Sequence, residues 1–160
     1  LLQAAQQKNI KVAFNPGKGE LADPERLKSI FRYLTILSLN KEEMQVLYPG
    51  ETPADLARAA HKDVPFVVVT DGPNGVAATD GQKVCVAGMY EDVPVIDRTG
   101  AGDAFSSGFT AMIAVGESLE KAITFGSANS TSVVQTIGAK AGILRSDAAL
   151  HEMPIETTTF

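Results

Sequence analysis

Short apolar segments alternate with capped helices along the first half of this 160-residue chain. Residues 65–70, PFVVVT, are β-branched and uninterrupted, which is typical of a strand buried on both faces. Residues 11–15 and 34–39 read as shorter buried strands. Strands that alternate with helices over short connections predict a mainly parallel sheet covered on both faces. The expected fold class is therefore α/β, with three α/β/α layers.

The helices between these strands carry clear start signals. Asp23 and Thr52 occupy N-cap positions, and a proline follows each of them at the first helical position. The remaining predicted elements are helices over 23–34, 40–48, 52–62, 100–115 and 118–135, strands over 76–80, 83–88 and 93–97, and a short helix in the tail after Arg145.

The chain opens without a methionine, as though inside a helix that leads into a strand. Leu1 and Leu2 are apolar, and Asn9 is suited to a helix C-terminus. We expect a truncated or proteolytic fragment, with a processed natural N-terminus as the alternative.

Charge and composition exclude several classes of function. The net charge of −5 argues against a broad nucleic-acid interface, which needs a basic face. A single cysteine excludes an internal disulfide, so a cytoplasmic location is expected. We find no apolar run long enough to cross a bilayer and no signal peptide, so no membrane partner is expected.

Three polar motifs, over 40–43, 70–75 and 97–103, follow predicted strands. In open α/β sheets ligands bind beyond the carboxyl ends of the strands, so we expect these motifs to converge on a ligand.

Residues 97–109, DRTGAGDAFSSGF, combine small residues with two acids at a predicted helix start. Backbone N–H groups at such a start carry partial positive charge and bind phosphate oxygens. Asp103 could simply favour the helix dipole. It could also be a general base that takes a proton from a hydroxyl as that hydroxyl attacks phosphorus. The spacing alone leaves both interpretations open.

The two other motifs also have structural alternatives. Residues 70–75, TDGPNG, could form an ordinary turn or the glycine-lined edge of a nucleotide site. Asn40 and Glu43 fit a capping box, and they could equally lie near phosphates, with Glu43 organising water around Mg²⁺.

Other patterns are weak. Residues 15–20, NPGKGE, lack the GxxxxGK[ST] spacing of a Walker loop, so Lys18 is expected to face solvent. His61 and His151 are isolated and expected at the surface, and Cys85 is expected to be a small core residue. No cluster has zinc-ligand spacing, and no GxGxxG joins a strand to a helix.

Taken in order, the three motifs resemble those of the ribokinase-like, or PfkB, carbohydrate kinases. The resemblance runs over about residues 11–144, and its most specific part is the GAGD motif, extended as GDAFSSGF. The matching residues are Asn40-x-x-Glu43, Thr70-Asp71-Gly72-x-x-Gly75 and Asp97-x-Thr99-Gly100-Ala101-Gly102-Asp103.

The resemblance implies a role for each of these positions. Asp103 would be the catalytic base, and Gly100, Ala101 and Gly102 would form the anion hole for the transferred phosphoryl group. Asn40 and Glu43 would position the phosphates and Mg²⁺. The loop that binds the nucleotide, ATP, would be formed by Thr70, Asp71, Gly72 and Gly75.

Residues 125–142 resemble the segment that covers the adenine and closes a monovalent-cation site, suited to K⁺. Ser127 and Asn129 would lie near the base. The cation ligands would come from Asp97, Thr99, Val133, Thr136 and Gly138. Arg98 stands where many members of the family have threonine, at a position that varies.

Family members are about twice as long, and their N-terminal half supplies most sugar contacts and the lid. Residues 1–160 therefore resemble the C-terminal, nucleotide-binding part of a single ribokinase-like domain, with the N-terminal half and the lid absent. We expect this piece alone to be inactive or to pair with another chain. The lid often dimerises in the family, so a homodimer of the full-length protein is compatible with the resemblance.

The leading hypothesis is an ATP-dependent kinase that phosphorylates a hydroxyl of a sugar or nucleoside. The residues that choose the substrate lie mainly in the absent half. A non-catalytic nucleotide-binding or regulatory module is the first alternative, and an unrelated Rossmann-like binding domain is the second.

Overall fold

A computed structural model describes all 160 residues, Leu1–Phe160. The chain forms two compact units. The first comprises residues 1–71, 76–86 and 157–160, and the second comprises residues 72–75 and 87–156.

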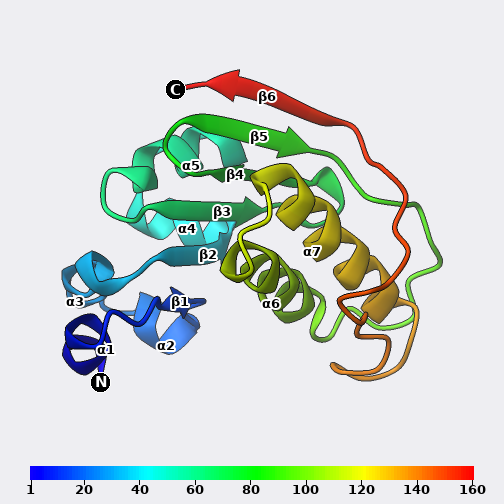
Figure 1. The fold of residues 1–160 in the computed structure, drawn as a ribbon, viewed down its shortest axis with the longest axis horizontal. Helices are drawn as coiled ribbons and strands as arrows, with labels where there is room; N and C mark the ends of the chain where they lie inside the picture. The colour runs from blue at the N-terminus through cyan, green and yellow to red at the C-terminus, as the bar shows by residue number, and fades with distance from the viewer. The chain divides into compact units, whose positions relative to one another are not determined.

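A six-stranded mixed sheet runs in the order β1-β2-β3-β4-β5-β6 (Figure 1). Strands β1, β2 and β3 are parallel, and β4 pairs with β3 in the antiparallel sense. The predicted α/β class is confirmed, and the sheet is mixed, because it combines the parallel pairs among β1, β2 and β3 with the antiparallel pair of β3 and β4. The strand bounds are β1 Ala13–Phe14, β2 Ile36–Asn40, β3 Phe66–Thr70, β4 Val76–Thr79, β5 Lys83–Ala87 and β6 Ile155–Thr159.

Helix caps in the first unit form where the sequence signals them. The side chain of Asp23 accepts a hydrogen bond from Arg26 N at 3.1 Å, and Thr52 Oγ1 accepts one from Asp55 N at 3.1 Å. Asn9 follows the first helix with a φ of 54°, as a helix C-terminus requires. The helices are α1 Leu2–Gln7, α2 Lys18–Leu21, α3 Pro24–Ser29, α4 Lys41–Leu47 and α5 Pro53–His61, with 3₁₀ turns η1 Phe31–Tyr33 and η2 Gly72–Asn74.

The core of the first unit lies around β2 and β3. Consecutive residues of both strands are buried, including Val67, Val68 and Val69, so side chains on both strand faces are removed from water. Such burial is expected of parallel strands and explains their uninterrupted apolar sequence. Side chains of the surrounding helices complete this core, among them Phe31, Met44, Leu56 and Ala60.

Two long helices, α6 Ala101–Ala114 and α7 Leu119–Val134, dominate the second unit and pack against each other. Their predicted positions are confirmed to within two residues at each end. A Cβ built on Gly126 would lie 3.0 Å from the carbonyl oxygen of Phe105, which shows how closely the two backbones approach. The core between them contains Phe105, Phe109, Ala122, Ile123 and Phe125.

The strand predicted over 93–97 does not form. Pro94 has no N–H group to donate, and the N–H groups of Ile96 and Asp97 both donate to the carbonyl oxygen of Val134 at the end of α7. The segment therefore bonds to a helix end rather than to a neighbouring strand. Its apolar side chains are not in a core either, because Ile96 is 62% exposed.

The tail also differs from the prediction. No helix forms after Arg145, and residues 155–159 form β6 at the end of the sheet. Four of these five residues are β-branched, which favours a strand. Arg58 holds the strand by donating to Thr158 Oγ1 at 2.6 Å. At the other end of the sheet, the strand predicted over 11–15 is shortened to the two residues of β1, and α2 forms where no helix was predicted.

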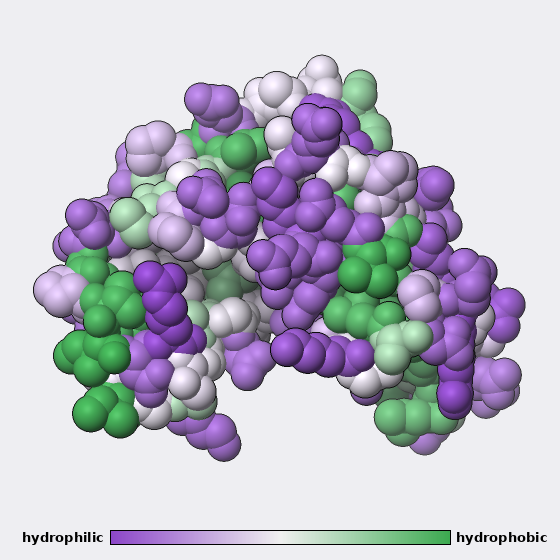
Figure 2. All heavy atoms as spheres, turned by 180° about the vertical axis from the view of Figure 1, so that it is seen from behind, coloured by the Kyte–Doolittle hydropathy of each residue, from purple (hydrophilic) through white to green (hydrophobic).

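Some large apolar side chains remain exposed. Green patches interrupt the hydrophilic surface on the face in Figure 2. Exposed apolar residues of the first unit include Leu1 and Ile10, and those of the second include Val115 and Ile137.

No helix of the structure combines the length and the apolar character that crossing a membrane would need.

Candidate functional site

The motif at 40–43 forms a capping box at the start of α4. Glu43 N donates to Asn40 Oδ1 at 2.9 Å, and Asn40 N donates to Glu43 Oε2 at 3.1 Å. Asn40 is also the last residue of β2 and is paired in register with Thr70, the last residue of β3. Two of the three predicted motifs therefore begin side by side at the carboxyl ends of neighbouring parallel strands.

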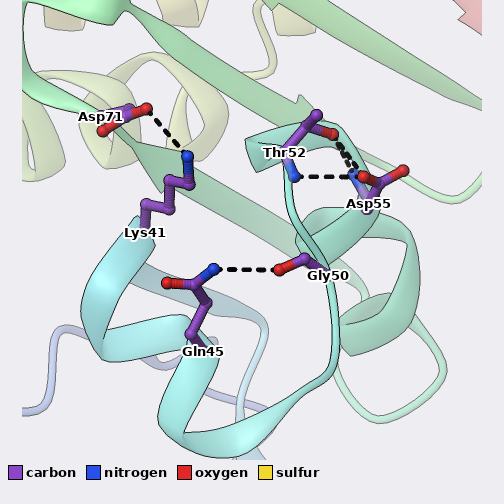
Figure 3. A network of polar contacts seen from close by, with 6 residues as sticks. All are labelled: Lys41, Gln45, Gly50, Thr52, Asp55 and Asp71. Atoms are coloured by element: carbon purple, nitrogen blue, oxygen red, sulfur yellow. Dashed lines mark hydrogen bonds and ion pairs between the residues drawn. The ribbon is translucent and has the colours of Figure 1, made fainter.

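An ion pair links these two strand ends. Lys41 Nζ lies 3.6 Å from Asp71 Oδ2, which connects the first turn of α4 to the residue after β3 (Figure 3). At the other end of α4, Gln45 Nε2 donates to Gly50 O at 3.0 Å. Charged and polar contacts therefore hold α4 at both of its ends.

Residues 70–75 turn the chain from β3 into β4, as the sequence predicts. Gly75 has a φ of 106°, and a Cβ at this position would overlap the carbonyl oxygen of Ala87. Only glycine fits this backbone without displacing its neighbour. The 3₁₀ turn η2 and the hydrogen bond from Gly75 N to Gly72 O at 3.2 Å complete the loop.

The GAGD motif forms the start of α6. Gly100 is the N-cap residue with a φ of 82°, and no side chain caps the helix. The N–H groups of the first turn are thus left without the side-chain acceptor that most helices provide. Asp103 is exposed in this turn, and its carboxylate has no hydrogen bond or ion pair within the chain.

Asp97 fixes the loop before α6. Its Oδ1 accepts from Thr99 N at 2.9 Å, and its Oδ2 accepts from Gly138 N at 3.0 Å. The N–H of Thr99, then its side chain, and the N–H of Gly138 lower the pKa of the Asp97 carboxyl below its usual range. The structure therefore brings together three of the five predicted cation ligands.

The other two predicted cation ligands lie at the end of α7. Val133 O accepts a hydrogen bond from Thr136 Oγ1 at 3.1 Å. The neighbouring carbonyl, that of Val134, accepts from Asp97 N at 3.2 Å, which joins this pair to the Asp97 loop.

Replacing Asp97 with asparagine is expected to destabilise the protein at neutral pH. A lowered pKa in the folded state means that the carboxylate stabilises the fold above its ordinary pKa of about 4. That stability is lost as the pH falls through the lowered folded value. The difference in unfolding free energy between the wild type and Asp97→Asn should therefore shrink in acid.

Denaturant titrations at several pH values measure this effect. Asp92→Asn is the matched control, because the Asp92 carboxylate in the same unit has no hydrogen bond within the chain. A stability difference for Asp97→Asn that stays constant down to strongly acidic pH would contradict the assignment.

A cavity of about 300 Å³ opens in the second unit beside the start of α6. Gly72 and Ala101 both line it, so residues of the 70–75 and 97–103 motifs share one cavity. The wall contains apolar side chains and three charged residues. Its lining residues are Gly72, Pro73, Met89, Glu91, Asp92, Val93, Val95, Arg98, Ala101, Ser130, Thr131 and Val134.

Ser127 and Asn129 do not line this cavity. Asn129 is 2% exposed, donates to Ala104 O at 2.8 Å and accepts from Leu144 N at 2.8 Å. It therefore joins α7 to α6 and to the chain beyond, while Ser130, Thr131 and Val134 face the cavity instead. The signal was present in the sequence, because Ala122, Gly126, Asn129 and Val133 follow the spacing of a buried helix stripe.

Comparison with known proteins matches residues 1–145 to the pfkB family of carbohydrate kinases. A cytidine kinase of Thermococcus kodakarensis is 30% identical over 142 residues, which cover 86% of this chain and 51% of that protein. A ribokinase of Arabidopsis thaliana, solved with ribose and ATP, superimposes with a TM-score of 0.76 at 27% identity, over 89% of this chain and 47% of that one.

A candidate ribokinase II of E. coli, solved with ATP and Mg²⁺, has the same fold. Its TM-score is 0.77 at 24% identity, over 90% of this chain and 48% of that protein. The chain spans about half the length of the curated relatives that it matches.

Proposed function

Because this chain belongs to the pfkB family of carbohydrate kinases, we propose that it carries the nucleotide-binding and catalytic part of an enzyme that phosphorylates a sugar or nucleoside with ATP. The observation that carries the proposal is the cavity lined by both Gly72 and Ala101, because it unites the nucleotide-loop motif with the GAGD motif. Relatives named as cytidine kinase and ribokinase support both classes of acceptor. Family membership also excludes the alternative of an unrelated Rossmann-like domain.

The proposed chemistry divides the work between the backbone and one side chain. Asp103 takes the proton of the acceptor hydroxyl, whose oxygen attacks the γ-phosphorus while the bond to the β-phosphate oxygen breaks and ADP leaves. The N–H groups of Gly100 and Gly102 stabilise the charge on the transferred group, while the N–H of Ala101 donates to Arg98 O. The free carboxylate of Asp103 supports this role, since nothing in the chain competes for it.

The residues present fit Mg²⁺ held through water. No group of three His, Cys, Asp or Glu side chains forms a metal cage in the structure. Mg²⁺ commonly keeps several waters and binds one or two carboxylates together with substrate phosphates, where it neutralises phosphate charge. Glu43 has its Oε2 in the capping box, which leaves Oε1 to accept from a metal-bound water, and Asn40 stands beside it.

The loop around Asp97 is the proposed monovalent-cation site, suited to K⁺. Support comes from the ionised carboxylate of Asp97 and from the backbone of Thr99 and Gly138 held against it. Carbonyl oxygens of the segment from Val133 to Gly138, together with Thr136, would complete the ligand set. Each carboxylate oxygen of Asp97 accepts one backbone N–H, and the remaining lone pairs are available to the Thr99 side chain and to a cation.

Residues 1–160 are proposed to be the C-terminal part of a single ribokinase-like domain. The isolated chain is expected to bind ATP and to phosphorylate no sugar or nucleoside at a rate typical of kinases, because most acceptor contacts would lie in the other half. Calorimetric titration with ATP and an ADP-release assay over a panel of acceptors test both parts. Turnover at an ordinary kinase rate by the chain alone would contradict the proposal that most acceptor contacts lie in the other half.

A non-catalytic nucleotide-binding module remains the alternative function. This alternative uses the same cavity and also predicts that the chain binds ATP, but it assigns no chemical role to Asp103. The two functions therefore differ in the consequence of replacing that carboxylate.

A further inference from the structure

Arg98 occupies a fixed position at the edge of the cavity beside α6. Its carbonyl oxygen accepts a hydrogen bond from Ala101 N at 3.2 Å, so Arg98 is the first residue of the turn that starts the helix. The preceding residue, Asp97, is held by two backbone N–H groups. Arg98 therefore extends from a backbone that is anchored on both sides.

The guanidinium of Arg98 has no polar partner within the chain. Arg98 lines the cavity together with Ala101, yet its side chain makes no hydrogen bond or ion pair within the chain. The neighbouring carboxylate that could have neutralised it, Asp97, accepts from backbone N–H groups instead. A cation with five donors is thus available at the cavity.

The other charges that line the cavity are two carboxylates from one segment, those of Glu91 and Asp92. Glu91 Oε2 lies 3.8 Å from His151 Nε2, and the His151 ring stacks on Tyr90. An anion entering the cavity is repelled by the two carboxylates and attracted by Arg98. The apolar side chains of Met89, Val93, Val95 and Val134 offer contacts for a flat ring.

We propose that Arg98 binds the polyphosphate of the nucleotide donor and makes this cavity selective for phosphorylated over unphosphorylated nucleosides. The inference rests on the proposed function and adds a binding residue to it. A guanidinium forms paired, charge-assisted hydrogen bonds to phosphate oxygens. A threonine at this position would offer one hydroxyl and no charge.

The test compares ATP with adenosine as ligands of the same chain. Arg98→Thr is expected to weaken ATP binding about ten-fold or more, as the loss of charge-assisted hydrogen bonds predicts, and to change adenosine binding less than about two-fold. Arg98→Lys should keep part of the ATP affinity, because it retains the charge and loses the paired geometry. Titration calorimetry gives both constants.

Arg145→Thr is the matched control. It removes the same charge from the same unit at a residue that lies outside the cavity and pairs with Asp147. It should leave both affinities unchanged. Raising the salt concentration should narrow the gap between the wild type and Arg98→Thr, because Arg98 is exposed.

Two failures can be told apart. If the wild type binds ATP and Arg98→Thr binds it equally well, or loses ATP and adenosine in parallel, the assignment of Arg98 is wrong and the proposed function stands. If the wild type binds no ATP, the proposed nucleotide site itself is wrong. Circular dichroism of each variant establishes that the fold is retained.

Discussion

Replacing Asp103 with asparagine is expected to slow phosphoryl transfer by about 100-fold to 10,000-fold, the usual contribution of a general base. Asparagine has nearly the shape of aspartate and cannot accept the proton of an attacking hydroxyl. ATP binding should persist, because Asp103 does not line the cavity beside α6. The measurement is kcat of an active kinase that contains these residues, together with an ATP titration of the same variant.

Asp147→Asn serves as the control for this experiment, because it removes an exposed carboxylate of the same unit that does not line the cavity beside the start of α6. The outcome also separates the two interpretations of Asp103. A carboxylate that only complements the helix dipole contributes about 0.3–1 kcal/mol to stability and nothing to turnover. Asp103→Asn with wild-type kcat would therefore support the non-catalytic module.

Replacing Gly100 with alanine should be the most disruptive single change at the start of α6. Gly100 has a φ of 82°, and an added Cβ would lie 2.5 Å from Ala139 O and 2.7 Å from Ala139 Cα. Both contacts are to backbone atoms of Ala139 rather than to the end of a flexible side chain. The turn at Gly100 or the loop that contains Ala139 therefore has to move. We expect a loss of about 1–3 kcal/mol in the free energy of unfolding, together with weaker ATP binding.

Gly102→Ala is the matched comparison two residues away. Nothing lies within 4 Å of a Cβ built on Gly102, and its φ is not in the left-handed region. Alanine there should leave stability unchanged or raise it by up to about 1 kcal/mol, since alanine favours a helix over glycine. Thermal and denaturant unfolding of both variants provide the readout. Equal losses at the two positions would show that the left-handed turn is not what requires Gly100.

Local signals were sufficient to predict much of this fold from sequence. Asp23 and Thr52 cap helices because their side chains reach the backbone N–H three residues on, a contact that depends on nothing distant. The strand predicted over residues 93–97 was wrong because a distant contact decides the structure there. These residues have the composition of a strand, and the donors of Ile96 and Asp97 are taken by Val134, which lies far along the chain.

The prediction of a helix in the tail after Arg145 was wrong for a related reason. The segment over 155–159 becomes a strand where β5 offers an edge and Arg58 offers a donor. Neither of these partners is visible in the local sequence.

The convergence of motif residues was predictable from the sequence, and the residues that line the cavity were not. Matching motifs locate Asp103 and Gly100 because their positions in the chain are fixed relative to the helix start. The direction of a side chain depends on helix phase, which motif matching ignores. That is why Asn129 belongs to the interior, while Ser130 and Thr131, its immediate successors, line the cavity.

The chain passes between its two compact units at four junctions, 71/72, 75/76, 86/87 and 156/157. Neither unit is therefore a continuous stretch of sequence, and one peptide-bond cleavage cannot release either of them whole. A fragment over 87–156 would keep α6 and α7 and lose Gly72 and Pro73 from the cavity wall. The wall thus depends on residues that lie on both sides of β4 and β5 in the sequence, which makes it sensitive to insertions there that leave both helices untouched.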